Sequence, residues 1–79
     1  MELDIFIKNF ADQFDETDAS EMEASTVFKT LDEWSSLIAL SVISMIDEEY
    51  NVVLKGDDIR EAVTIEDLFN MVKSRVEKG

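Results

Sequence analysis

The 79-residue sequence predicts an all-α fold, a small four-helix bundle with three main helices and one short helix. Proline is absent and glycine occurs at positions 56 and 79 alone, which argues against a turn-rich all-β fold. Apolar side chains recur at helical spacing in three separate segments. Serine or threonine stands directly before two of these segments, where its side-chain oxygen can cap a helix. A chain of this length forms one small domain, residues 1–79.

The first helix is expected over about residues 2–15, because apolar side chains there follow the helical period: Leu3, Phe6, Ile7, Phe10 and Phe14. Residues 16–35 are mostly polar, acidic or small and show no apolar period over most of their length. They predict a surface loop, held to the core by Phe28 and Leu31. The phenylalanines are expected in the core, and Trp34 is expected to anchor the chain just before the next helix.

The second helix is predicted over about residues 36–50, with Ser35 or Ser36 as its N-cap. One side is apolar and predicts the face toward the core: Ala39, Val42, Ile43, Ile46 and Tyr50. The opposite side is mixed and carries Ser36, Leu37, Leu40, Ser41, Ser44, Asp47 and Glu48. A purely solvated face would not favour its two leucines, although single exposed leucines are common.

The β-branched segment after this helix, Asn51–Leu54, has no partner strand and predicts an extended connection. A short helix is expected over about residues 57–62. The last helix is expected over about residues 65–77, capped by Thr64 with Asp67 as the acidic member of a capping box. Its apolar side chains again follow the helical period: Ile65, Leu68, Phe69, Val72 and Val76.

Charge narrows the possible partners. Nineteen Asp and Glu against seven Lys and Arg give a formal net charge of −12. Such a field repels nucleic acid and anionic membranes, attracts proteins with basic patches, and favours a monomer. The longest apolar run, Leu37–Leu40, is too short for membrane insertion. The first residues lack the features of a signal peptide, so we expect a cytoplasmic protein.

The residue types present argue against catalysis and metal binding. Neither cysteine nor histidine occurs, which removes the commonest nucleophiles, bases and zinc ligands. The acidic runs Asp47–Glu49 and Asp57–Asp58 are typical of solvated faces, and a bundle this small offers no evident cleft for two converging carboxylates. The segment after Asp15 lacks the glycine and closing glutamate of a calcium-binding loop. We therefore expect neither an enzyme nor a metal site.

Ser36 is the remaining candidate for chemistry. On spacing alone, Ser35 or Ser36 merely caps the second helix. A second interpretation is that a phosphate is attached to Ser36, because a helix N-terminus presents free N–H groups and a positive dipole end. Leu37 and Leu40 would then contact an enzyme that docks on the helix, while acidic side chains attract its basic surface. The pattern does not choose between the two interpretations.

From Phe28 to Val76 the chain resembles the acyl carrier protein family without gaps. The resemblance rests on Trp34-Ser35-Ser36-Leu37, on the apolar helix ending Asp47-Glu48-Glu49-Tyr50, and on Thr64-Ile65-Glu66-Asp67-Leu68. It implies a stand-alone carrier with the helical bundle of that family. A phosphopantetheinyl transferase would attach 4′-phosphopantetheine from coenzyme A to Ser36.

The resemblance also implies what the carrier does. Its acyl or aminoacyl cargo would be held as a thioester on the arm and presented to acyl-activating and acyl-transferring enzymes with basic docking patches. The positions that match the family's recognition surface are Leu37, Leu40, Ser41, Ser44, Asp47 and Glu48.

The chain departs from the family pattern at several positions. Ser35 replaces the aspartate of the Asp-Ser-Leu motif, and the glycine often found upstream is replaced around Glu33 and Trp34. Ile38 and Ser41 stand where many members carry acids. These departures favour a specialised biosynthetic pathway with dedicated partners. The alternative is a non-enzymatic acidic helical adaptor or inhibitor, an unmodified carrier homologue that binds a basic partner protein.

Overall fold

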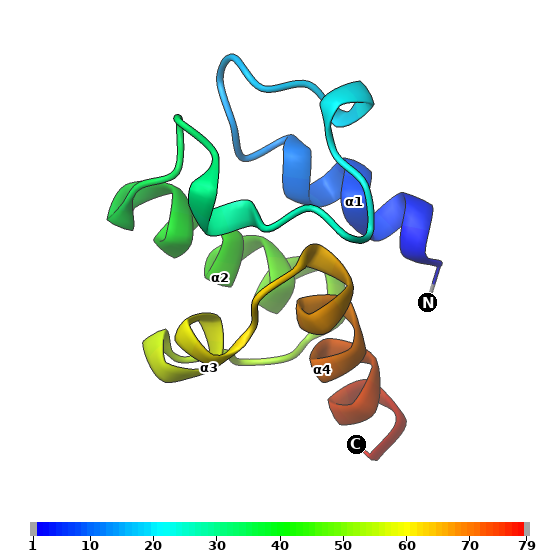
Figure 1. The fold of residues 1–79 in the computed structure, drawn as a ribbon. Helices are drawn as coiled ribbons and strands as arrows, with labels where there is room; N and C mark the ends of the chain where they lie inside the picture. Colours follow the sequence, from blue (N-terminus) through cyan, green and yellow to red (C-terminus); the bar gives the residue numbers. More distant parts are fainter. Residues whose placement is uncertain (1, 79) are drawn as a thin grey trace.

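The computed structural model describes the backbone of residues 2–78 and the side chains of residues 2–77. This part of the chain contains four helices and no strand, as the sequence predicts (Figure 1). The helices are α1 (Leu3–Ala11), α2 (Ser36–Tyr50), α3 (Gly56–Glu61) and α4 (Ile65–Lys78). Two 3₁₀ turns, η1 (Ala19–Glu21) and η2 (Phe28–Thr30), interrupt the long loop. Within residues 2–78, no helix combines the length and the apolar character needed to cross a bilayer.

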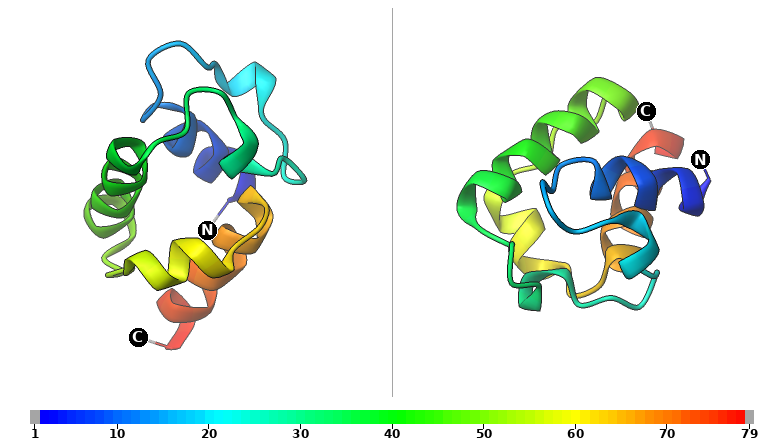
Figure 2. Two further views of the ribbon diagram at one scale, coloured as in Figure 1. Left: turned by 60° about the vertical axis from the view of Figure 1, so that its left-hand side comes forward. Right: turned by 90° about the horizontal axis from the view of Figure 1, so that it is seen from above.

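The three longer helices pack against one another in every pairing, α1 with α2, α1 with α4 and α2 with α4. The two further views in Figure 2 show them around a common centre, with the long loop over α1. All five phenylalanines are buried, which confirms their predicted place in the core. The largest side chains that are fully buried are Phe6, Phe10, Phe28, Val42, Ile46, Ile65, Leu68 and Val72.

Helix α1 is shorter than its apolar spacing predicts, because it ends at Ala11 and not near residue 15. Gln13 and Phe14 close the last turn with i→i−3 hydrogen bonds, and Phe14 is buried from that turn. The next three backbone N–H groups donate to the side chain of Glu33 and not to carbonyls of the helix. The helix stops where a side chain distant in sequence takes over these donors.

The predicted surface loop, residues 16–35, contributes several side chains to the core. Phe28 is fully buried, Leu31 packs against the core, and Met22 is buried as well. The loop also completes α4, because the N–H of Ile65 donates to the carbonyl of Thr26 at 3.1 Å. The N–H of Glu66 donates to the carbonyl of Ala24 at 2.9 Å. These donors have no acceptor inside the helix, so the loop satisfies them.

The second half of the chain follows the sequence closely. Asn51–Leu54 is an extended connection, and α3 begins at Gly56, one residue before its predicted start. The predicted capping box of α4 is confirmed: Asp67 N donates to Thr64 Oγ1 at 3.1 Å, and Thr64 N donates to Asp67 Oδ2 at 3.0 Å. Asp58 joins α3 to α4 through two hydrogen bonds from Arg75, at 2.8 and 3.1 Å.

Candidate functional site

The start of α2 separates the roles of its two serines, which the sequence leaves open. Ser35 is the N-cap, with extended backbone, and its Oγ accepts the N–H of Ile38 at 3.3 Å. Ser36 is the first residue of the helix and is exposed. Because Ser35 provides the cap, the hydroxyl of Ser36 lies at the surface without a capping role.

The outward face of α2 carries most of the residues predicted to meet a partner. Leu37 is 73% exposed and Leu40 63% exposed. The polar members Ser44, Asp47 and Glu48 are exposed too. Ser41 differs, because it is half-buried and lines a hollow between α2 and α1. Five of the six predicted partner-binding residues therefore lie on the accessible surface.

An aromatic cluster holds the chain just before the site, as predicted for Trp34. The ring of Trp34 lies 4.9 Å from that of Phe28 in an edge-to-face arrangement, and 6.4 Å from that of Phe10 in a stacked one. Phe14 contacts the same indole at 6.3 Å between ring centroids. These contacts anchor the entry to α2 on the core and so define where Ser36 emerges.

Glu33 is a structural residue that the sequence reasoning missed. Its carboxylate accepts the backbone N–H groups of Asp15, Glu16 and Thr17, and the hydroxyl of Thr17 at 2.9 Å. Partial desolvation raises the pKa of Glu33, but these hydrogen bonds outweigh it and lower the pKa below its ordinary value of 4.5. No local signal in the sequence marks this role, because the donors lie sixteen to eighteen residues away.

A hollow of about 390 Å³ lies directly beside Ser36, between the start of α2 and α3. It is lined by Lys29, Trp34, Ser35, Ser36, Ala39, Gly56, Ile59 and Arg60. Lys29 Nζ donates to the carbonyl of Arg60 and so bridges η2 to α3. Arg60 forms an exposed ion pair with Asp57 at 3.4 Å.

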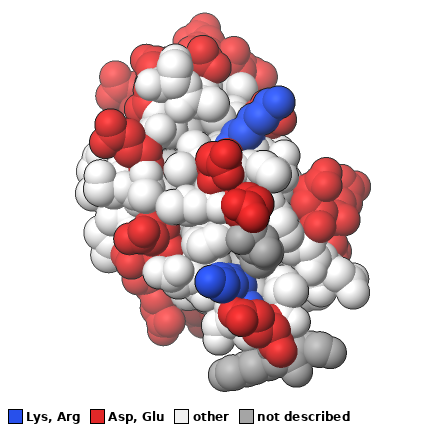
Figure 3. Space-filling view, turned by 90° about the vertical axis from the view of Figure 1, so that its right-hand side faces the viewer, with Lys and Arg blue, Asp and Glu red and all other residues white. Residues whose placement is uncertain are grey.

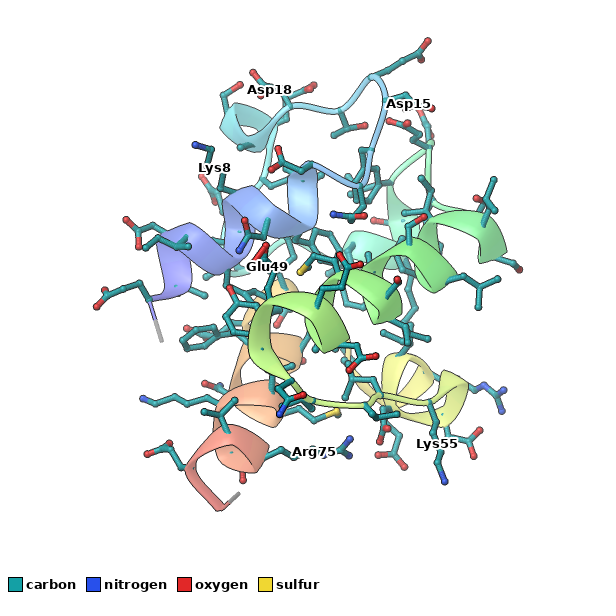
Figure 4. The ribbon with its side chains drawn as sticks, turned by 180° about the vertical axis from the view of Figure 1, so that it is seen from behind. Lys8, Asp15, Asp18, Glu49, Lys55 and Arg75 are labelled. Carbon is teal, nitrogen blue, oxygen red and sulfur yellow. The ribbon has the colours of Figure 1, made fainter. Side chains whose placement is uncertain are left out.

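Acidic side chains are scattered over the remaining surface and outnumber basic ones (Figure 3). On the face drawn in Figure 3, Asp and Glu are spread widely while Lys and Arg appear singly. Figure 4 shows Lys8 and Asp18 where the loop passes over α1, and Glu49 on α2. Among the residues with described side chains, no group of three or more Asp and Glu is arranged to hold a metal ion.

Compared with protein-family models, curated proteins and solved structures, the chain matches none of them.

Proposed function

We propose that the protein is a carrier of the acyl carrier protein type, with 4′-phosphopantetheine attached to the hydroxyl of Ser36. The proposal depends on one observation, the different positions of the two serines at the start of α2. Ser35 caps the helix while the adjacent Ser36 is exposed at its first position. Two leucines of the same helix, Leu37 and Leu40, are also largely exposed and would be available to a partner there.

The residues around Ser36 fit this prosthetic group. Its phosphodiester is an anion, which the free N–H groups and dipole of a helix N-terminus stabilise. The hollow beside the hydroxyl leaves room for the arm to lie against the protein. When bound, the arm supplies the terminal thiol for a thioester, which a chain without cysteine does not supply itself.

The same surface is suited to transient docking of partner enzymes. Leu37 and Leu40 offer apolar contacts next to the attachment point. Asp47 and Glu48 lie exposed farther along α2, where they would attract a basic patch and accelerate encounter. The proposed partners are a phosphopantetheinyl transferase and enzymes that load or remove the cargo.

The direct test is intact mass after incubation with coenzyme A and a broad-specificity phosphopantetheinyl transferase. The parent should gain one phosphopantetheine and Ser36→Ala none. Ser44→Ala is the matched control, because it removes an exposed hydroxyl from the same helix, and it should be modified like the parent. If the parent gains no phosphopantetheine in this reaction, and the protein isolated from its own host is unmodified as well, the carrier proposal fails. The exposed leucines and acids would then favour the adaptor.

The docking surface is tested with Leu37→Ala and Leu40→Ala. Both side chains are exposed, so their removal should change the free energy of unfolding by no more than about 0.5 kcal/mol. The rate of modification at Ser36 should nevertheless fall. Val53→Ala removes an equally exposed apolar side chain, 69% accessible, outside α2. Equal rates for all three variants and the parent would exclude this face as the docking surface.

A further inference from the structure

The hollow beside Ser36 differs in charge from two other hollows on the described surface. The hollow beneath the long loop is lined by Lys8 together with four acidic residues, Asp12, Asp15, Glu16 and Asp18. The hollow between α1 and α2 is lined by Asp12, Glu48 and Glu49 without a base among its described residues. Beside Ser36 the described lining holds two bases, Lys29 and Arg60, and no acid.

This local excess of basic side chains is notable because the chain has only seven basic residues and a net charge of −12. A phosphodiester on Ser36 would add a further negative charge to an acidic protein, and two cations in the adjoining hollow would offset it. The first turn of α2 also lacks an acidic residue. The hollow next to Ser36 therefore holds two bases, and the first turn of α2 adds no acid to offset them.

We propose that this hollow, which we call the α2–α3 groove, seats the phosphodiester and the adjoining part of the arm. The inference rests on the proposed function. Lys29 and Arg60 face the phosphate oxygens, while Trp34, Ala39 and Ile59 contact the uncharged part of the arm. The arm of the resting carrier then lies along the protein, and a partner enzyme must draw it out of the groove.

Both bases retain donors for this role. Lys29 Nζ has three N–H groups, and the contact to the carbonyl of Arg60 occupies one of them. Among the described side chains, the guanidinium of Arg60 pairs only with Asp57, and both side chains are at least 80% exposed. An ion pair so exposed is weak and exchanges readily for a phosphate.

Trp34 provides a direct readout, because it is the only tryptophan of the chain and lines the groove. The experiment measures acrylamide quenching of its fluorescence before and after attachment of the arm, with attachment verified by intact mass. In the parent, attachment should lower the quenching constant. In the double variant Lys29→Gln/Arg60→Gln, attachment should leave the constant unchanged. Added salt should reduce the protection in the parent, because it screens the phosphate from the two bases.

Two control variants separate charge at the groove from fold and from total charge. Lys8→Gln/Lys73→Gln removes the same total charge outside the groove and should keep the protection. Lys29→Arg/Arg60→Lys keeps both charges and should keep it as well. Circular dichroism checks that each variant remains helical.

The outcomes also separate this inference from the proposed function. Attachment at Ser36 without any change in Trp34 quenching overturns the groove and leaves the carrier intact. Equal loss of protection in Lys8→Gln/Lys73→Gln overturns the role of Lys29 and Arg60. Absence of attachment in the parent, both with the transferase and in its own host, overturns the proposed function and the groove together.

Discussion

The two ends of α2 differ in whether their side chains stabilise the helix. Its start follows the rules that stabilise helices, with Ser35 as N-cap and an aromatic cluster that anchors the preceding residue. Its end carries the acidic run Asp47–Glu49, all exposed, and the last turn has no base. The helix then closes on Asn51 in the left-handed conformation, at φ 56°.

The acidic end opposes the helix dipole, because carboxylates are unfavourable near a C-terminus. In the part of the chain that the structure describes, none of these three acids forms an ion pair. A helix shaped by stability alone would carry bases there. The difference between the ends teaches that the start of α2 serves the fold, while the charge at its end suits the docking role that we propose.

The largest expected effect on stability concerns Asn51, the C-cap of α2. Replacing it with valine should destabilise the protein by about 1–2 kcal/mol, because a β-branched residue is strained at positive φ. Asn51→Gly should leave stability unchanged or slightly improved, since glycine adopts this conformation without strain. Urea unfolding of both variants measures the difference. Equal loss in the two would show that the backbone conformation is not the cause.

The N-cap at the start of α2 should contribute less to the free energy of unfolding than the C-cap at Asn51. Ser35→Ala should cost about 1 kcal/mol, because the N–H of Ile38 loses its acceptor. Ser35→Asp should retain the stability, since a carboxylate caps equally well and suits the positive end of the dipole. Thermal and urea unfolding give the values. A Ser35→Asp variant as unstable as Ser35→Ala would contradict the assigned cap.

Neutralising the acidic end should stabilise the protein slightly. Glu48→Gln and Glu49→Gln should each raise the free energy of unfolding by roughly 0.3–1 kcal/mol at low ionic strength. The gain should vanish in high salt, which screens exposed charges. Glu2→Gln, at the start of α1, should give no gain, because a carboxylate there is favourably placed. If Glu48→Gln and Glu49→Gln are neutral at low salt, the contrast between the two ends of α2 disappears.

The smallest expected effect is the contribution of Glu33, in the segment before α2, to the pH dependence of stability. The pKa of Glu33 is lowered in the folded protein, so its stabilising effect is present above its unfolded value of 4.5. That effect is lost as the pH falls through the lower, folded pKa. Urea unfolding between neutral and strongly acidic pH should therefore show a weaker pH dependence for Glu33→Gln than for the parent. Glu16→Gln, whose side chain accepts none of these hydrogen bonds, serves as control.

Much of the fold was predictable because its signals are local. Ser35 and the apolar period define α2, and Thr64 with Asp67 defines the start of α4. These are contacts within one or two helical turns, which a sequence displays directly. The outward direction of Leu37 and Leu40 follows from the same period and is confirmed by their exposure.

The end of α1 was not predictable, because Phe14 continues the apolar period beyond the helix. The competing interaction comes from Glu33, whose carboxylate takes the backbone donors of residues 15–17. A local pattern contains no information about such an acceptor. The loop is similar, since Thr26 and Ala24 complete α4 across a long interval of sequence.

The sequence by itself determined the helical class, the N-terminal cap of α4, the buried and exposed faces of α2, and the exposed surroundings of Ser36. Each depends on residues a few positions apart, where helical geometry alone decides which side chains meet. Only the tertiary structure decided where α1 stops and which cations lie beside Ser36. Lys29 and Arg60 are thirty-one residues apart, and they meet because η2 and α3 pack at the same end of α2. The positive groove in an acidic chain is therefore a property of packing and not of composition.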